Sequence, residues 1–274
     1  MRVGKDHFFD FGMPRIPFNK QLAKLSDDEK ISLARDRTKE LTYRIQNCLE
    51  LFAACELVCY SDHLANQVSK THAAEAFAIL QRALFEQLVV KILSLWDKPE
   101  DNSISIPTVC LLIDSQSVIQ QLCGEAFDDN YLKEPHKFAA TSDTEFNADI
   151  TFEIRRIRNT FAMERSEKAK SSLLNCVRAA KEIRNQERHE GLSNLRDRVV
   201  HSLTRPRREE AGKIHVARYG YEKQLLLESC TIIEELYCWI NGTSYKIIDD
   251  QLKTAQADAS ALWHNLIYSR QEDI

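Results

Sequence analysis

The sequence predicts an all-α fold, an elongated helical bundle, and three observations lead to this prediction. Only seven glycines and six prolines occur in 274 residues, which is well under half the usual supply of turn formers. Apolar residues recur at helical spacing along most of the chain, and no segment alternates as a half-buried strand does. Because a β-sandwich or barrel needs a turn about every ten residues, so few turn formers exclude those classes.

The chain is expected to begin with an irregular N-terminal arm over residues 1–25, which hold two glycines, two prolines and four phenylalanines. Ser26 and Glu29 have the spacing of a capping box, so a helix is expected to start there and to run to about residue 65. Thr71 is expected to cap the next helix, whose apolar stripe occupies residues 77–95.

The middle of the chain is expected to hold a third helix and an insertion. Ser105 can cap the helix, with Pro107 in its first turn, where a missing N–H costs nothing. Residues 124–148 are acidic, and we expect them to form an irregular insertion between core helices that can include a short helix. Helical spacing then resumes over 149–165 and 167–203.

Glycine and proline punctuate the rest of the chain. Gly191 can interrupt the 167–203 stretch, and Pro206 ends it, because the residue before a proline avoids the α region. The helix over residues 221–240 is expected to close at Gly242, and a last helix is expected over about 244–268. These limits predict an arm (1–25), one bundle (26–242) and a C-terminal helix (243–274) that packs on the same domain.

The eight cysteines indicate a reducing compartment. They include no CxxC pair and no signal peptide follows Met1, so we expect free thiols and a cytoplasmic location. Cys55, Cys59 and His63 follow at four-residue intervals, but a fourth ligand is missing, so a buried stripe is favoured over a metal site. The most apolar run, residues 83–96, is too short and too polar to span a bilayer. No cofactor and no membrane partner are expected.

Charge is distributed unevenly along the chain. The formal net charge is −4, yet residues 151–218 carry 17 Lys and Arg against nine Asp and Glu, a net of +8. This polarity favours one face that binds a polyanion. A solvated helix surface with i, i+4 ion pairs explains the charge alone equally well.

Within the basic window, Arg196 and His201 are separated by four residues. They stand about 140° apart on a helix, yet a long arginine near a helix end can reach the same phosphate as the histidine. Asp197 lies one helical turn before His201 and can orient its imidazole. Phosphate contacts are expected from nearby arginines, namely Arg198, Arg205, Arg207 and Arg208. The alternative is an exposed arginine with a histidine that interacts with the helix dipole.

Three segments together resemble HEPN domains, and more specifically the abortive-infection, AbiU-type branch. They are ALFEQLVVKILSLWDKPEDNSISIPTVCLLI, LRDRVVHSLTRP and YEKQLLLESCTIIEELYCWING, and the resemblance spans residues 30–242. Its chemically specific part is the Arg-polar-x3-His motif at Arg196 and His201. Toxins of the branch that pair with a nucleotidyltransferase antitoxin usually carry a tyrosine two residues past the histidine. Here that position is Leu203, so regulation through a tyrosine there is not expected.

The resemblance implies a HEPN-type bundle and a metal-independent endoribonuclease of phage defence or a toxin–antitoxin pair. Its RNA site would form where the motif helices of a homodimer meet, and an antitoxin or defence partner would accompany it. His201 would act as acid and base, Arg196 would neutralise the scissile phosphate, and Asp197 would orient the pair. The expected products are a cyclic phosphate and a 5′-hydroxyl end.

Two alternatives stay open from the sequence. Arg184 and His189 have the same spacing, with the more usual asparagine after the arginine, and form a rival catalytic pair. The chain can also be a non-catalytic helical module that binds RNA or protein, or a plain bundle whose basic window pairs with the acidic insertion.

Overall fold

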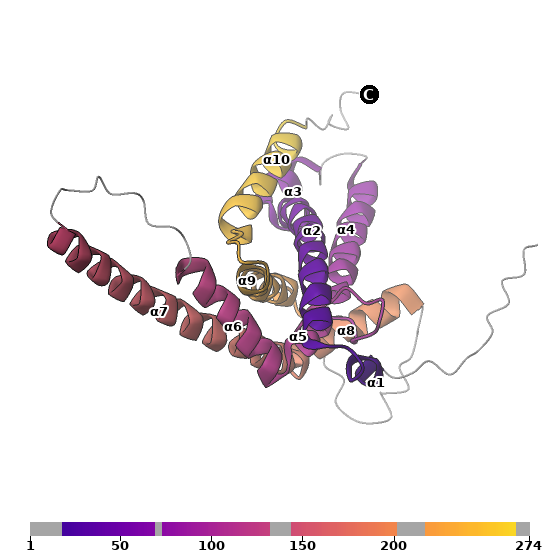
Figure 1. The fold of residues 1–274 in the computed structure, drawn as a ribbon. Coiled ribbons are helices and arrows are strands. Elements are labelled where there is room, and N and C mark those ends of the chain that lie inside the picture. Colours follow the sequence, from indigo (N-terminus) through magenta and orange to yellow (C-terminus); the bar gives the residue numbers. More distant parts are fainter. Residues whose placement is uncertain (1–17, 69–72, 132–143, 202–216, 267–274) are drawn as a thin grey trace, which may run out of the picture.

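The computed structural model describes residues 18–68, 73–131, 144–201 and 217–266, and over these ranges it is helical with no strand. The all-α prediction is therefore confirmed. The elements, shown in Figure 1, are α1 (Phe18–Leu22), α2 (Asp27–Tyr60), α3 (Asp62–Val68), α4 (Ala74–Ser94), α5 (Ile106–Ile113), α6 (Gln116–Tyr131), α7 (Thr144–Arg184), α8 (Glu187–His201), α9 (Tyr221–Asn241), the π-helical segment η2 (Ile247–Leu252) and α10 (Lys253–Trp263).

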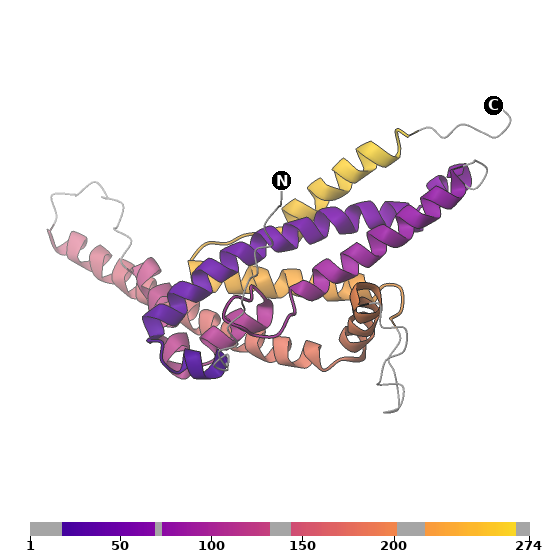
Figure 2. The same ribbon diagram turned by 90° about the vertical axis from the view of Figure 1, so that its right-hand side faces the viewer.

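Helix α2 is the centre of the bundle. It packs against α9, α10, α4 and α5, and Figure 2 shows α10 and α4 running beside it. Its inward side chains, such as Leu41, Ile45 and Leu49, are fully buried and join one large core that also takes residues from α4, α5, α7 and α9. The apolar stripe that predicts this helix is therefore the stripe that builds the core.

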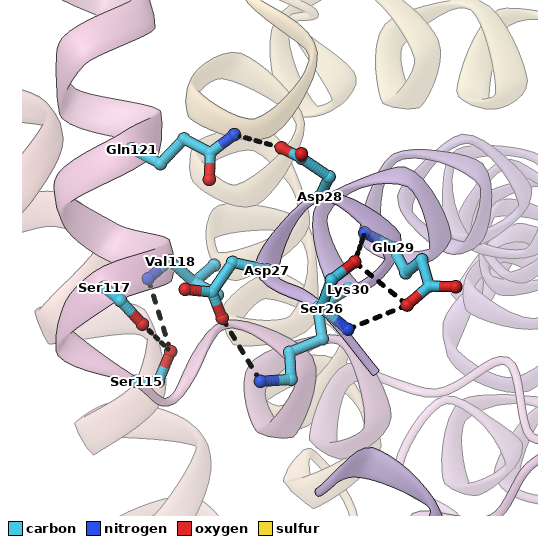
Figure 3. Close-up of polar contacts among 9 residues, drawn as sticks. All are labelled: Ser26, Asp27, Asp28, Glu29, Lys30, Ser115, Ser117, Val118 and Gln121. Carbon is cyan, nitrogen blue, oxygen red and sulfur yellow. Dashed lines mark hydrogen bonds and ion pairs between the residues drawn. The ribbon is translucent and has the colours of Figure 1, made fainter. Parts of the chain in front are cut away.

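The start of α2 is fixed by short polar side chains, which Figure 3 shows together with α6. The Ser26 hydroxyl accepts the Glu29 N–H at 3.3 Å, and the Glu29 carboxylate accepts the Ser26 N–H at 2.8 Å. The predicted capping box is thus present. Hydrogen bonds from Ser117 and Lys30 lower the pKa of the Asp27 carboxyl. These contacts join the first turn of α2 to α6.

The end of α2 differs from the prediction. The helix stops at Tyr60 rather than near residue 65, because Ser61 has extended backbone (φ −80°, ψ 112°). The Ser61 hydroxyl then accepts the N–H of Leu64 at 3.4 Å and so caps α3. The proposed cap Thr71 lies outside the described residues, and α4 begins at Ala74.

The cap of α5 is confirmed, whereas one side chain of α4 is not where it was expected. Ser105 accepts the N–H of Thr108 at 3.3 Å, and Pro107 occupies the first turn of the helix. In α4, Phe77 of the predicted apolar stripe is buried, but Leu80, which helical spacing places on the same stripe, is 38% exposed.

The expected irregular insertion over 124–148 is helical at both of its ends. Helix α6 continues to Tyr131 and α7 begins at Thr144, while residues 132–143 lie outside the described part. The two helices pack along each other, and in Figure 1 the N-terminal part of α7 extends away from the bundle. Glu125 is also bound by Arg35 of α2. Such tertiary contacts stabilise helix where the apolar pattern is weak.

The basic segment forms two helices whose boundary also departs from the prediction. One helix, α7, covers 149–165 and continues to Arg184. The chain turns at Asn185 and Gln186, whose N–H groups bond to the Glu182 and Ile183 carbonyls at 3.1 Å each. Gly191, the candidate break, is buried inside α8.

The two ends of the chain also correct the prediction. Part of the expected arm is helical, because α1 occupies residues 18–22. Gly242 ends α9 with φ 71°, as a glycine C-cap requires. The last helix is shorter than predicted, because η2 precedes α10, which packs against Ala53 of α2 through Ala255 and Ala259.

Within the described residues, no helix combines the length and the hydropathy that a bilayer crossing needs. All eight cysteines are free thiols.

Candidate active site

The main cleft of the described structure has a volume of about 890 Å³. It lies where the loop between α4 and α5 faces the turn between α7 and α8. Its lining side chains include Arg44, Trp96, Asp97, Lys98, Glu100, Arg184, Asn185, His189, Glu190, Arg196 and Asp197. Both candidate arginine–histidine pairs therefore contribute to one cleft. The first pair contributes Arg196, and the rival pair contributes both Arg184 and His189.

Arginines of α2 hold the loop wall of this cleft. The Arg44 guanidinium donates to the Ile104 carbonyl at 3.3 Å, and Arg37 donates to the carbonyls of Asp101 and Ser103. The loop ends where the N–H of Ile106 bonds to the Leu95 carbonyl at 2.8 Å, next to the start of α5. An irregular segment is thereby fixed against the central helix.

Helix α9 anchors residues from both sides of the cleft. Arg188, in the first turn of α8, forms an ion pair with Glu228 of α9 at 2.5 Å. Trp96, which is buried, donates its indole N–H to the Ser229 hydroxyl at 2.9 Å. The Trp96 and His189 rings meet edge to face, with centroids 6.0 Å apart. These contacts set the direction in which α8 enters the cleft.

Arg196 is held by two carboxylates. Its guanidinium forms an ion pair with Asp97 at 3.1 Å and lies 3.4 Å from the Asp197 carboxylate. Its side chain is 30% exposed, so part of the planar group still faces the cleft. Such a fork of donors suits a phosphate group.

His189 is neutral at physiological pH. Burial, and then the positive charges of Arg184 and Arg196, lower its pKa from 6.5 to about 4. Its Nε2 atom is buried and has no hydrogen-bond partner among the described residues. An imidazole with so low a pKa is a weak base and cannot act as an acid near pH 7.

The remaining predicted residues are only partly described. His201 is the last residue of α8, and its side chain and that of Arg198 lie outside the described structure. Arg205, Arg207 and Arg208 fall in residues 202–216, which the structure does not describe. The catalytic roles of Arg196, His201 and Asp197 therefore stay predictions.

The sequence reasoning missed the loop that completes the cleft. Asp97 contacts Arg196 across 99 positions of the chain, and Trp96 packs on His189. No spacing rule links residues so far apart. The described lining holds four Lys and Arg and four Asp and Glu, so the excess of basic residues that the sequence predicts for this region is not found in this part of the cleft.

The cysteine stripe is largely buried, as expected. Cys55 is buried and Cys59 partly so, with their sulfur atoms 3.6 Å apart. The His63 ring lies against that of His264, at 5.9 Å between centroids. Among the described side chains, no group of three or more His, Cys, Asp or Glu is arranged as a metal site.

Comparison with known proteins identifies the family. The model of the HEPN family AbiU2 matches residues 29–263, which is most of the chain and includes every wall of the cleft. No curated protein and no solved structure gives a significant match. The chain therefore belongs to the AbiU2 family of HEPN proteins.

Proposed function

We propose that this protein is a metal-independent endoribonuclease of an abortive-infection or toxin–antitoxin system. The observation that carries the proposal is the position of Arg196 in the large cleft, five residues before His201 on the same helix. Family membership supports the same conclusion, because the Arg-polar-x3-His pattern is the chemically specific part of the resemblance to HEPN domains.

In this proposal His201 takes the proton of the ribose 2′-hydroxyl or supplies one to the leaving oxygen. A histidine suits this task because its ordinary pKa lies near neutral pH. Arg196 neutralises the charge that develops on the phosphate. Asp197, which already contacts Arg196, keeps the guanidinium in place. The strand breaks into a 2′,3′-cyclic phosphate and a 5′-hydroxyl end.

The rival pair fits this chemistry less well. His189 is neutral, is packed on Trp96 and has its pKa lowered to about 4. Arg184 ends α7 and His189 lies in the first turns of α8, so the two straddle a turn. We therefore assign the catalytic roles to Arg196 and His201, and binding roles to the residues around His189.

The experiment incubates purified protein with structured and unstructured RNA in excess EDTA. We expect His201→Ala and Arg196→Ala to reduce cleavage by about 100-fold or more, and the matched control Arg178→Ala, on the exposed face of α7, to leave it unchanged. Loss of cleavage in His189→Ala but not in His201→Ala would overturn the site assignment. A requirement for Mg²⁺ would reject the mechanism.

We further propose that the active form is a homodimer in which two clefts combine. The test mixes two inactive variants, Arg196→Ala and His201→Ala. If one composite site uses residues of both copies, mixed dimers recover part of the wild-type activity. A protein that sediments as a monomer at the concentration of the assay, and is active there, contradicts this arrangement.

A non-catalytic RNA-binding module is the second candidate, and two observations favour it. Arg196 is already paired with Asp97 and Asp197, and acidic and basic residues balance in the described lining of the cleft. In that case wild-type protein binds RNA without cleaving it, and the affinity falls steeply as salt is added.

A further inference from the structure

A second, smaller pocket adjoins the cleft and has a different chemical character. Its volume is about 360 Å³, and it lies between α5 and the last turns of α7. Six of its ten lining residues are apolar: Pro99, Pro107, Cys110, Leu111, Val177 and Ala180. It shares two further lining residues, Arg184 and Asn185, with the large cleft. The small pocket and the large cleft therefore adjoin each other at Arg184 and Asn185.

The polar groups of the pocket gather at its rim. Lys181 forms an ion pair with Asp114 at 2.7 Å, and both side chains are exposed to solvent. Arg184 is the last residue of α7, and Asn185, the first residue of the turn, is exposed. An apolar interior with a few polar groups at the edge is typical of a site for a small organic group.

Arg184 differs from the other arginines of this region in its partners. Arg188 is bound by Glu228 and Arg196 by Asp97. Arg184 has no hydrogen-bond or carboxylate partner within the described part of the chain. Arg184 and Arg196 line the same large cleft, and the charges of both act on His189 between them in the sequence. An unpaired cation beside a paired one can bind a second phosphate group.

We propose that the small pocket holds a base of the RNA strand, and that Arg184 binds the phosphate that joins this nucleotide to the one at Arg196. The apolar walls receive the faces of the base, and the amide of Asn185 can hydrogen-bond its edge, which gives some preference among bases. Single-stranded RNA fits these features, because its bases are free to leave the strand and enter a pocket. The inference rests on the RNA substrate proposed above.

The test measures binding by fluorescence anisotropy with a 2′-O-methyl oligoribonucleotide, which has no free 2′-hydroxyl and so cannot be cleaved by the proposed route. A second ligand has the same backbone without bases. Leu111→Trp fills the pocket, and Leu174→Trp, on an exposed position of α7, is its matched control. Arg184→Ala removes the cation, and Arg178→Ala is its control on the same helix.

We expect Arg184→Ala to weaken binding of both ligands by about tenfold. The slope of log affinity against log salt concentration should also fall by the amount expected for one phosphate contact. Leu111→Trp is expected to weaken binding of the base-containing ligand by about tenfold and to leave binding of the abasic ligand unchanged. Both controls are expected to stay within about twofold of wild type, since surface changes away from a site have small effects.

Other outcomes separate this inference from the proposed function. Unchanged binding by Leu111→Trp or Arg184→Ala overturns the inference, whatever the cleavage assay shows. A collapse of kcat with unchanged KM in Arg184→Ala also overturns it, because Arg184 would then belong to the catalytic pair. If wild type binds with the expected pattern but does not cleave RNA, the inference stands and the nuclease proposal fails.

Discussion

The protonation of His189 should make folding depend on pH in a predictable way. Its pKa is about 4 in the folded protein, against 6.5 in the unfolded chain. Between these pH values the unfolded chain binds the proton more strongly than the folded protein does. The free energy of unfolding therefore has its full value above pH 6.5 and decreases as the pH falls toward 4. At pH 5 the loss relative to pH 7.5 is about 2 kcal/mol from this one group.

The cause is local, so a single substitution should remove the effect. Arg184 and Arg196 lie near the imidazole, Trp96 packs on it, and the carboxylates of Glu190 and Asp197 also line the cleft. His189→Gln keeps a polar side chain that does not titrate. We therefore expect this variant to lose about 2 kcal/mol less than wild type between pH 7.5 and pH 5.

The assay is urea unfolding at the two pH values for wild type, His189→Gln and His63→Gln. The control variant removes an exposed imidazole outside the cleft. Because other groups also titrate in this range, the informative quantity is the difference between the pH dependences of the variants. If His189→Gln and wild type lose the same free energy within about 0.5 kcal/mol, the imidazole is not held neutral by the cleft and the reasoning is refuted.

Single contacts of Glu222, Glu234 and Asp97 should also have measurable effects. Glu222 is buried and accepts hydrogen bonds from the Gly220 N–H at 2.9 Å and from the Tyr60 hydroxyl at 3.2 Å. We expect Glu222→Ala to lower the free energy of unfolding, measured in urea, by about 2–3 kcal/mol. An unchanged value would contradict this role. Glu234 accepts the first two N–H groups of η2; Glu234→Ala should speed proteolysis between α9 and α10, and equal digestion rates would argue against it. Asp97→Asn removes the charge that pairs with Arg196. RNA binding, measured by fluorescence anisotropy, should become up to about fivefold tighter. Weaker binding would mean that the Asp97 carboxylate positions Arg196.

Local signals in the sequence predicted the helix ends well where one side chain makes the cap. Ser26, Ser105 and Gly242 all act as expected, because a cap depends on hydrogen bonds and dihedral angles within a few residues. The predicted end of α2 near residue 65 is wrong, because the helix stops at Tyr60, and the candidate break at Gly191 does not occur. A glycine in a helix costs only about 1 kcal/mol, which burial of the helix offsets, so Gly191 does not break α8.

The insertion shows the limit of apolar periodicity. Residues 124–131 have a weak pattern, yet they continue α6, because α7 packs along them and Arg35 of α2 binds Glu125. These stabilising groups come from elsewhere in the chain. No window of sequence around the segment contains them.

For the candidate site, the sequence by itself determined which residue types are present and that Arg196 and His201 follow one another on a helix, since both depend on neighbours along the chain. Only the tertiary structure decided that Arg184, His189 and Arg196 share one cleft with Asp97. That arrangement depends on how α8 packs on α4 and α9 and on the loop that α2 holds. Contacts across about a hundred residues arise from the packing of whole helices, which local propensity does not encode.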